Sequence, residues 1–392
     1  MISVAEALAQ VLALARPLPP ERVPLAEALG RVLAQPVTAR LTQPPFDAAA
    51  MDGYWIAAAD ARPGARLIVT GAAAAGHAHQ GALSPGQALR IFTGAPCPAA
   101  PGRVIPQEDV TREGDGITLG TLPKSAHIRP RGGDFAEGAE VFPRRPLTPR
   151  DLGLMAAMNI AELPVHRRPQ VAIIATGDEL VMPGERPGPD QILCSNSFLL
   201  AGAVTQAGGI ARMLPIARDT EASLRAVLGA AEGADLIVTS GGASVGEHDL
   251  VGKVAGEMGL ARAFWQVAMK PGKPLMAGRL GGAVLLGLPG NPVAAAVCAD
   301  LFLAPVLKRF QGLEIPASTA KAVLGCDVPP EGPRAHYQRA RLSLGGDLPV
   351  ITPFAQQDSA GLSVLAQADA LLIRPPQDGP RSAGEIVDYL PL

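Results

Sequence analysis

The chain has 392 residues, of which 48% are hydrophobic and 18% are charged, and its formal net charge is −2. This composition excludes an intrinsically disordered protein, and the length predicts two to four folded domains. The near-neutral charge provides no general attraction to nucleic acid or anionic lipid, so any basic binding site has to be local.

The N-terminal segment carries apolar residues at helical spacing. Val4, Leu8, Val11 and Leu12 predict an amphipathic helix rather than a signal peptide, and we expect helical structure to about residue 42. No run of about 18 uncharged apolar residues is present, so no membrane span is expected. The four cysteines lie far apart without the spacing of a metal site, which predicts a reduced, cytoplasmic protein.

The next segment, residues 43–130, is rich in Gly and Pro and contains short β-type runs at 66–71, 88–94 and 116–122. These features predict a small β domain. Residues 131–168 then return through a helical stretch at 148–160. We therefore predict an elongated α+β domain formed by residues 1–42 and 131–168, with the small β domain inserted between its two parts.

From residue 169 strand and helix signals alternate. Strands are expected at 171–175, 212–217, 234–239 and 283–288, and helices at 197–209, 220–233, 250–258 and from 292 onward. This alternation predicts a multidomain α/β protein whose central domain, residues 169–315, is a doubly wound α/β/α structure with a parallel sheet. The tail, residues 316–392, alternates in short strands and is expected to form a β-barrel-like domain.

Polar clusters follow each of the four central strands, and ligands of doubly wound sheets bind beyond the carboxyl ends of the strands. Two clusters are rich in glycine, which lets the backbone approach an anion and exposes its N–H groups. Each turn alone is equally consistent with a tight connection or a helix cap, but two at one edge favour a phosphorylated ligand. The residues concerned are Ser240, Gly241, Gly242 and Ser244 in one turn and Pro289, Gly290, Asn291 and Pro292 in the other.

Carboxylates stand at the same edge, where they would repel an anionic ligand. Asp178, Glu179, Asp219 and Asp249 therefore predict a hard cation such as Mg²⁺ between them and the phosphate. Solvated acids at helix starts are the alternative for Glu179 and Asp219. His248 has no partner in the sequence pattern and is interpreted as a surface residue.

Two of the six lysines, Lys270 and Lys273, flank a Pro-Gly turn. Like charges held this close are unfavourable without a counter-charge, so the pair predicts an oxyanion site, with a solvated basic turn as the alternative. The N-terminal half contributes the polar residues Asp52, Thr93, Glu108 and Asp134, any of which is also compatible with turn chemistry.

Seven motifs appear in the order typical of one family: AMDGYWI, RIFTGAPCP, RPRGGDFAEGAEVFP, ATGDEL, SGGASVGEHD, KPGKPL and GLPGNP. Over essentially its whole length the chain resembles the MoeA family, the molybdopterin molybdenumtransferases, which include the gephyrin E-domain. The resemblance implies that adenylylated molybdopterin binds, molybdate enters, the phosphoanhydride is split with the help of Mg²⁺, and molybdenum cofactor and AMP leave. It also implies an elongated homodimer whose active site is shared between subunits, and transient complexes with other cofactor-biosynthesis proteins.

The resemblance assigns roles to the candidate residues. Molybdate would be bound by Lys270, Lys273, Arg339 and Ser359. Adenylylated molybdopterin would be bound by Thr93 and by the two glycine-rich turns, the metal by Asp249, Asp219 and Glu108, and catalysis would involve Asp249, Asp178, Glu179, Asp52 and Asp134. Three positions depart from the family pattern: Cys194 replaces an Asp, Ala294 replaces a Ser, and Asp358 replaces the Gly before Ser359.

Three other functions remain open at this stage. Residues 169–315 also resemble the adenylyltransferase that makes the adenylylated pterin. A scaffold of the gephyrin type would bind receptor peptides without turnover, although the lysine pair and the carboxylates argue against a purely structural role. A nucleotide-binding α/β domain of unrelated function is the third alternative.

Overall fold

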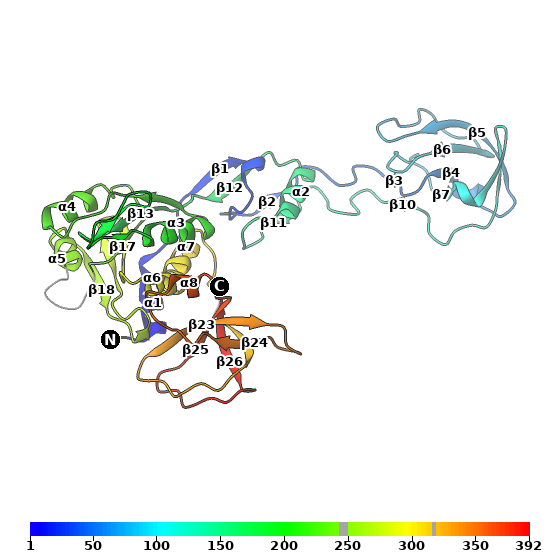
Figure 1. Ribbon diagram of the computed structural model, residues 1–392. Helices are drawn as coiled ribbons and strands as arrows, with labels where there is room; N and C mark the ends of the chain where they lie inside the picture. The colour runs from blue at the N-terminus through cyan, green and yellow to red at the C-terminus, as the bar shows by residue number, and fades with distance from the viewer. Residues whose placement is uncertain (243–249, 316–318) are drawn as a thin grey trace. The chain divides into compact units, whose positions relative to one another are not determined.

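The computed structural model describes residues 1–242, 250–315 and 319–392 (Figure 1). The described chain divides into two compact units, each treated by itself below. The first unit contains Met1–Glu21, Gly30–Ala34 and Val165–Leu392, and the second contains Arg22–Leu29 and Gln35–Pro164. The four-domain division expected from the sequence is finer than this partition and stays a prediction.

A six-stranded sheet forms the centre of the first unit. Its order is β16 (Ile210–Met213), β13 (Gln170–Ala175), β17 (Leu236–Ser240), β21 (Ala283–Leu288), β20 (Met276–Leu280) and β18 (Ala261–Trp265). The first four strands are parallel, as predicted, whereas β20 and β18 extend the sheet in antiparallel fashion. The short strands β14 (Leu180–Val181) and β15 (Ile192–Leu193) pair separately.

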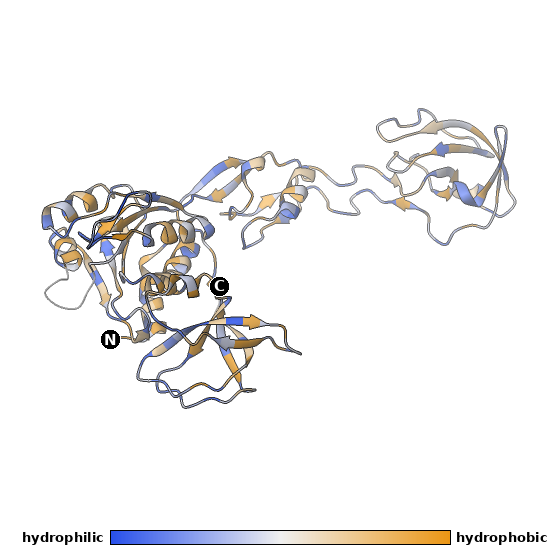
Figure 2. Ribbon diagram, viewed as in Figure 1, coloured by the Kyte–Doolittle hydropathy of each residue, from blue (hydrophilic) through white to orange (hydrophobic). Residues whose placement is uncertain are grey.

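Helices cover both faces of this sheet, which explains why its inner strands β13, β17 and β21 are buried and largely apolar (Figure 2). One face packs against α1 (Val4–Leu14), α3 (Asn196–Gln206), α6 (Pro292–Cys298) and α7 (Ala304–Phe310), and the other against α4 (Glu221–Gly229) and α5 (Leu250–Glu257). Along β13 the side chains alternate between these cores, since Ile173 joins the first and Ile174 the second. The predicted doubly wound α/β/α fold is confirmed.

A closed barrel of five strands follows. Its strands are β23 (Ala335–Ser343), β24 (Val350–Pro353), β22 (Ala320–Leu324), β26 (Ile386–Pro391) and β25 (Ala370–Arg374), and the β25–β23 pairing closes the ring. Closure leaves no free sheet edge. A short strand from the central part of the chain, β19 (Met269–Lys270), adds to β23, and a one-turn helix, α8 (Leu362–Leu365), precedes β25.

The second unit is dominated by another six-stranded sheet. Its order is β7 (Gly102–Pro106), β4 (Gly53–Ala57), β6 (Gln87–Ile91), β5 (Arg66–Ala73), β9 (Gly116–Leu119) and β8 (Val110–Glu113). Shorter elements complete the chain: the pairs β1 (Pro20–Pro24) with β12 (Glu162–His166), β2 (Val37–Thr38) with β11 (Glu140–Val141) and β3 (Ala48–Ala49) with β10 (Ile128–Arg129), the helix α2 (Pro149–Ala157), and 3-10 turns at Leu25–Glu27, Ala58–Asp60 and Gln107–Asp109.

Three sequence-based expectations about elements were wrong. The first helix ends at Leu14 rather than near residue 42, because the prolines between positions 17 and 24 cannot continue a helix. The strand expected at 212–217 begins at Ile210 and ends at Met213. The single helix expected from 292 is interrupted by a π-helical turn, Ala299–Leu303, because Pro305 has no N–H to offer the preceding turn.

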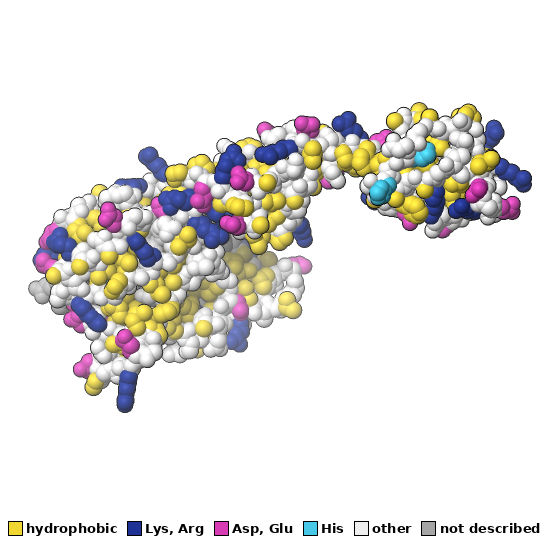
Figure 3. Space-filling view, turned by 90° about the horizontal axis from the view of Figure 1, so that it is seen from above, with side chains coloured by type: hydrophobic (Ala, Val, Ile, Leu, Met, Phe, Trp, Pro, Cys, Tyr) yellow, Lys and Arg dark blue, Asp and Glu magenta, His cyan; other side chains and the backbone are white. Residues whose placement is uncertain are grey.

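Among the residues that the structure describes, no helix is both long enough and apolar enough to cross a membrane. On the face seen in Figure 3, basic and acidic side chains are interspersed. This agrees with the small net charge of the sequence.

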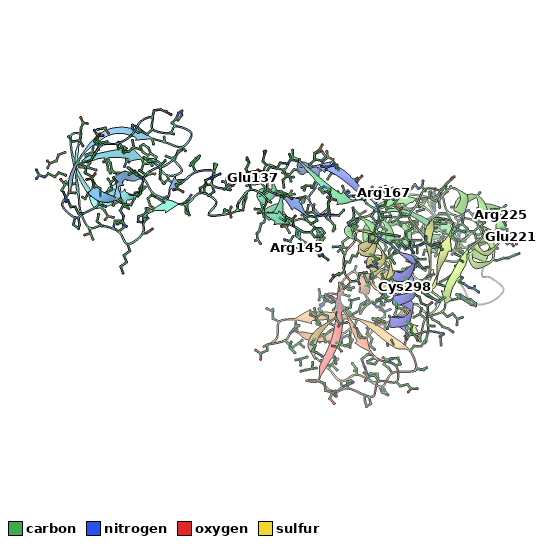
Figure 4. All side chains as sticks on the ribbon, turned by 180° about the vertical axis from the view of Figure 1, so that it is seen from behind. Glu137, Arg145, Arg167, Glu221, Arg225 and Cys298 are labelled. Carbon is green, nitrogen blue, oxygen red and sulfur yellow. The ribbon has the colours of Figure 1, made fainter. Side chains whose placement is uncertain are left out.

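Helix α2 begins with a reciprocal cap. Thr148 Oγ1 accepts from the N–H of Asp151, and the Asp151 carboxylate accepts from Thr148 N at 2.7 Å. Arg145, labelled in Figure 4, binds the same carboxylate with two N–H groups at 2.6 and 2.9 Å. The Arg145 hydrogen bonds, followed by those from Thr148, hold the pKa of Asp151 well below its usual range despite partial desolvation.

We predict that Asp151→Asn lowers the local free energy of unfolding of α2 by about 1–2 kcal/mol at pH 7. Because the folded pKa is depressed, the stabilisation is fully present above the unfolded carboxyl pKa, roughly 4, and is progressively lost at lower pH. Amide hydrogen exchange of α2 at pH 7 and pH 3 measures this, with the exposed Glu113→Gln as control. The stabilising role of the Asp151 carboxylate would be contradicted if wild type and variant had the same α2 exchange protection at pH 7, or if their difference in protection were as large at pH 3 as at pH 7.

Candidate functional site

Two adjoining cavities lie at the carboxyl edge of the central sheet, both within the first unit. The larger has a volume of about 900 Å³ and the smaller about 270 Å³. Pro274, Pro289 and Asn291 line both of them, so the cavities share a wall. The larger is also lined by the residues that follow β13, β17 and β21, including 175–177, 240–242 and 289–292.

The glycine turn after β17 is conformationally demanding. Gly241 and Gly242 have φ angles of 92° and 64°, and a Cβ at Gly241 would lie 2.8 Å from the carbonyl oxygen of Thr176. The Gly241 N–H donates to Leu288 O at 3.2 Å, so this amide is not free to bind a phosphate, contrary to the expectation of two exposed N–H groups. Of the predicted residues in this turn, Ser244 lies outside the described residues.

The two predicted anion turns are brought together by an asparagine that sequence reasoning did not single out. Asn196, at the start of α3, donates from Nδ2 to Ser240 Oγ and to Gly290 O, each at 2.8 Å. Its Oδ1 atom is buried without a partner among the described residues, and the side chain lines the larger cavity. Asn196 therefore fixes the spacing of the two turns. The only feature of the sequence that pointed to it was its position two residues after Cys194, where the chain departs from the family pattern.

Asn291 occupies the N-cap position of α6, but its side chain makes no capping hydrogen bond. The adjoining amide of Val293 donates instead to Ser359 O at 3.0 Å. Asn291 therefore stands at the N-cap position without capping through its side chain, and the Val293 amide in the first turn of α6 is satisfied by the loop that carries Ser359.

The carboxylates of Asp178 and Asp219 lie next to one another. Asp219 N donates to Asp178 Oδ1 at 3.1 Å and Asp178 N to Asp219 Oδ2 at 3.4 Å. Arg218 stabilises the loop by donating to the carbonyl oxygens of Asp178 and Leu180, both at 3.1 Å. Glu179 and Asp219 line the larger cavity, so three of the four predicted edge carboxylates share this region.

These carboxylates fit a hard divalent cation by their donor type, since neighbouring Asp oxygens are ligands that Mg²⁺ prefers. Within the described residues no cluster of three or more His, Cys, Asp or Glu side chains is close enough to hold a metal by itself. A cation here would need ligand oxygens as well. Asp249 lies outside the described residues, and Glu108 belongs to the second unit.

The smaller cavity gathers the predicted oxyanion residues with one exception, Arg339. Lys270, Lys273 and Ser359 line it, and so do Arg334 and His336, which were not predicted. Its remaining lining includes Gln357 and Ala294, one of the positions that departs from the family pattern.

Arg339 does not line the smaller cavity. It is 1% exposed, and its guanidinium donates to Gly361 O at 3.1 Å and Gln356 O at 3.2 Å. Desolvation lowers its pKa. Arg339 therefore positions the loop that carries Ser359 rather than contributing a direct oxyanion contact, and Arg334 supplies a guanidinium at the cavity instead.

The N-terminal candidates all lie in the second unit. The Asp52 carboxylate accepts hydrogen bonds from Thr93 N at 2.8 Å and Thr93 Oγ1 at 2.7 Å, and the backbone bond is the main cause of its lowered pKa. Glu108 is exposed in a 3-10 turn, and Asp134 donates its N–H to Gln43 O at 3.0 Å. The structure thus brings Asp52 and Thr93 together.

Cys194 lines the larger cavity but is almost fully buried. Its Sγ lies 3.2 Å from Ser197 Oγ at the start of α3. The thiol therefore packs into the cavity wall at the position where the family pattern has an acidic residue.

Three family sequence profiles match the chain in order. They are described as the MoeA N-terminal region (domain I and II), matching residues 2–159, a probable molybdopterin binding domain, matching 172–309, and the MoeA C-terminal region (domain IV), matching 321–392. Together they cover both units described above.

Whole-chain comparisons agree. The molybdopterin molybdenumtransferase 2 of Mycobacterium tuberculosis is 37% identical over 386 residues, covering 95% of each chain. That of Bacillus subtilis is 31% identical, covering 94% of this chain and 89% of the relative. The crystal structure of a molybdopterin biosynthesis MoeA protein from Pyrococcus horikoshii superposes with a TM-score of 0.86 at 30% identity, covering 100% of this chain and 99% of that one. The cavity geometry, the ordered profiles and these relatives together show that the chain belongs to the MoeA family of molybdopterin molybdenumtransferases.

Proposed function

We propose that this protein is a transferase of molybdenum cofactor biosynthesis that inserts molybdenum from molybdate into adenylylated molybdopterin and releases AMP. The observation that carries the proposal is the shared wall of Pro274, Pro289 and Asn291 between the two cavities. A large cavity at a sheet edge suits a pterin nucleotide, and a small one lined by Lys270 and Lys273 suits a dianion. Their contact supports a reaction in which the two substrates are bound side by side.

The chain's own residues account for most of the required chemistry. The ammonium groups of Lys270 and Lys273 neutralise the oxyanion, and the Ser359 hydroxyl donates to it. The turns held together by Asn196 position the phosphoanhydride of the nucleotide substrate near this cavity. Asp52 and Thr93, held by their mutual hydrogen bonds, and Asp134 contribute polar groups from the second unit.

Asp178 and Asp219, with Glu179 beside them, would hold Mg²⁺ together with substrate oxygens, and Asp249 and Glu108 are further candidate ligands. When bound, the ion supplies positive charge that offsets the charge developing on the phosphoanhydride as it is cleaved. The carboxylates are then counter-charges of the ion rather than a source of repulsion toward the substrate.

The names of the curated relatives favour this function over an adenylyltransferase or a gephyrin-type scaffold. The basic test is mass analysis of AMP release from adenylylated molybdopterin with and without molybdate. A scaffold without turnover releases no AMP, and an adenylyltransferase forms the adenylylated pterin from ATP instead.

The Lys270→Gln/Lys273→Gln variant should raise the molybdate concentration needed for half-maximal turnover roughly 100-fold, because two charge-assisted contacts are lost. Binding of the adenylylated pterin should change little. The measurement is AMP release against molybdate concentration, with Lys308→Gln/Lys321→Gln as an exposed double control. If the first variant showed the same dependence of AMP release on molybdate concentration as the wild type, neither lysine would be a molybdate ligand.

Asp219→Asn should raise the Mg²⁺ concentration for half-maximal AMP release by about tenfold, since one anionic oxygen ligand is lost. Titration of Mg²⁺ at saturating substrate measures this, and the exposed Glu232→Gln should behave like wild type. An Asp219 variant with the wild-type Mg²⁺ dependence would exclude this carboxylate as a metal ligand.

We also propose a homodimer in which Asp52, Thr93 and Asp134 of one chain complete the site of its partner, as the family resemblance implies. The proposal predicts that a mixed dimer of Asp52→Asn with Lys270→Gln/Lys273→Gln regains about half the wild-type activity, because one of its two sites contains no substitution.

Differently tagged chains allow this mixed dimer to be purified and assayed for AMP release against each parent. If every site were built within one chain, the mixed dimer would be as inactive as both parents. A monomeric mass by light scattering would overturn the proposal directly.

A further inference from the structure

The wall of the smaller cavity contains a buried histidine that the proposed chemistry has not used. His336 is 4% exposed, lines the cavity, and lies directly opposite Lys270 in the register of β19 with β23. A titratable ring thus stands beside one of the two lysines proposed to bind the oxyanion.

One nitrogen of this ring has a fixed partner. His336 Nδ1 lies 2.7 Å from Glu331 Oε1 and 3.2 Å from Gln338 Nε2, and Gln338 Nε2 also donates to Glu331 Oε1 at 2.8 Å. Two atoms that both bear lone pairs approach this closely only with a proton between them, and with Glu331 as an ionised carboxylate that proton is on Nδ1 and Glu331 accepts it. The proton that exchanges with solvent is therefore the one at Nε2, on the ring edge left for the cavity.

The charges around the ring are mostly positive. Lys270 lies opposite it on β19 and Arg374 opposite it on β25, Lys273 and Arg334 line the same cavity, and Glu331 is its anionic partner. Arg374 is paired with Asp378, so it is partly compensated. Burial, followed by the influence of Lys270 and Arg374, lowers the pKa of His336, while Glu331 opposes this shift.

A neutral His336 presents a lone pair at Nε2 to the cavity, which repels the oxygens of an oxyanion. A protonated His336 presents an N–H donor and a positive charge, but this state is unfavourable beside the cations unless an anion is present. The ring and the oxyanion therefore stabilise each other only when the ring is charged.

We propose that His336, held by Glu331, is a direct ligand of the bound oxyanion and acts as its imidazolium, so that each oxyanion enters the smaller cavity together with one proton. The step is a protonation: Nε2 takes a proton from solvent and donates it in a hydrogen bond to an oxyanion oxygen, while the Nδ1–H bond to Glu331 is kept. The inference rests on the proposed function for the identity of the oxyanion.

Thermodynamic linkage fixes the sign of the pH dependence. The ring has a lower pKa in the empty cavity than in the filled one, so binding takes up a proton between these two values. In that window the oxyanion affinity rises by up to tenfold for each unit of falling pH, and it levels off at lower pH. An oxyanion site made only of lysines and arginines has constant affinity across the same range, because those groups stay charged.

The test is calorimetric titration of the full-length protein with sodium molybdate between pH 6 and 8.5. Buffers of different ionisation enthalpy report the number of protons taken up. We expect up to one proton per molybdate in the wild type and none for His336→Gln, whose affinity should be independent of pH. Glu331→Gln should move the proton-linked window to lower pH, because the imidazolium loses its counter-charge.

The exposed His77→Gln, in the second unit, is the matched control and should keep the wild-type proton uptake. Thermal melting identifies a variant that fails to fold, and in that case the wild-type proton count and the Glu331→Gln shift decide the question. Wild-type binding without proton uptake, or an equal uptake by folded His336→Gln, overturns the role of His336. Absence of molybdate binding by the wild type at every pH instead refutes the proposed oxyanion site, and the inference with it.

Discussion

The geometry of the candidate site depends on the pairing of two residues, Met269 and Lys270, with strand β23 of the barrel. This short parallel pairing fixes the lysine turn against β23, and the smaller cavity forms where the two structures meet. Without it, two ammonium groups on a Pro-Gly turn would move apart into solvent, because their mutual repulsion opposes close approach. The barrel therefore forms part of the wall of the smaller cavity and is not only an appended domain.

A second constraint acts on the neighbouring loop. Arg339 is buried, and the cost of desolvating its guanidinium is offset by hydrogen bonds to the carbonyl oxygens of Gln356 and Gly361. Ser359 lies between these two acceptors and in turn satisfies the Val293 amide at the start of α6. A chain of hydrogen bonds thus connects β23 to the helix that follows β21, and it positions the wall shared by both cavities.

The sequence predicted the α/β/α core well because hydrophobic runs and their flanking glycines are local signals, as in β13, β17 and β21. It also predicted that Lys270 and Lys273 share one site, since only three positions separate them. It did not predict that Arg339 is buried, because the enclosure of five consecutive residues, 336–340, on β23 depends on the barrel and the loop beside it, which no local pattern reveals. Asn196, Arg334 and His336 escaped notice because their importance arises from contacts with residues up to 94 positions away.

The close approach of the two glycine-rich turns has a further consequence. A Cβ at Gly290 would lie 3.5 Å from the Cα of Gly241, so the main chains of the two turns are nearly in contact. This part of the larger cavity is consequently shaped by peptide groups, whose positions do not change with side-chain rotamers. Such a floor offers the same surface to any phosphate ester, and discrimination between ligands then falls to the exposed side chains of the lining, Ile192 and Leu193. Substitutions that alter ligand preference are accordingly expected to accumulate at these exposed side chains while the floor stays unchanged.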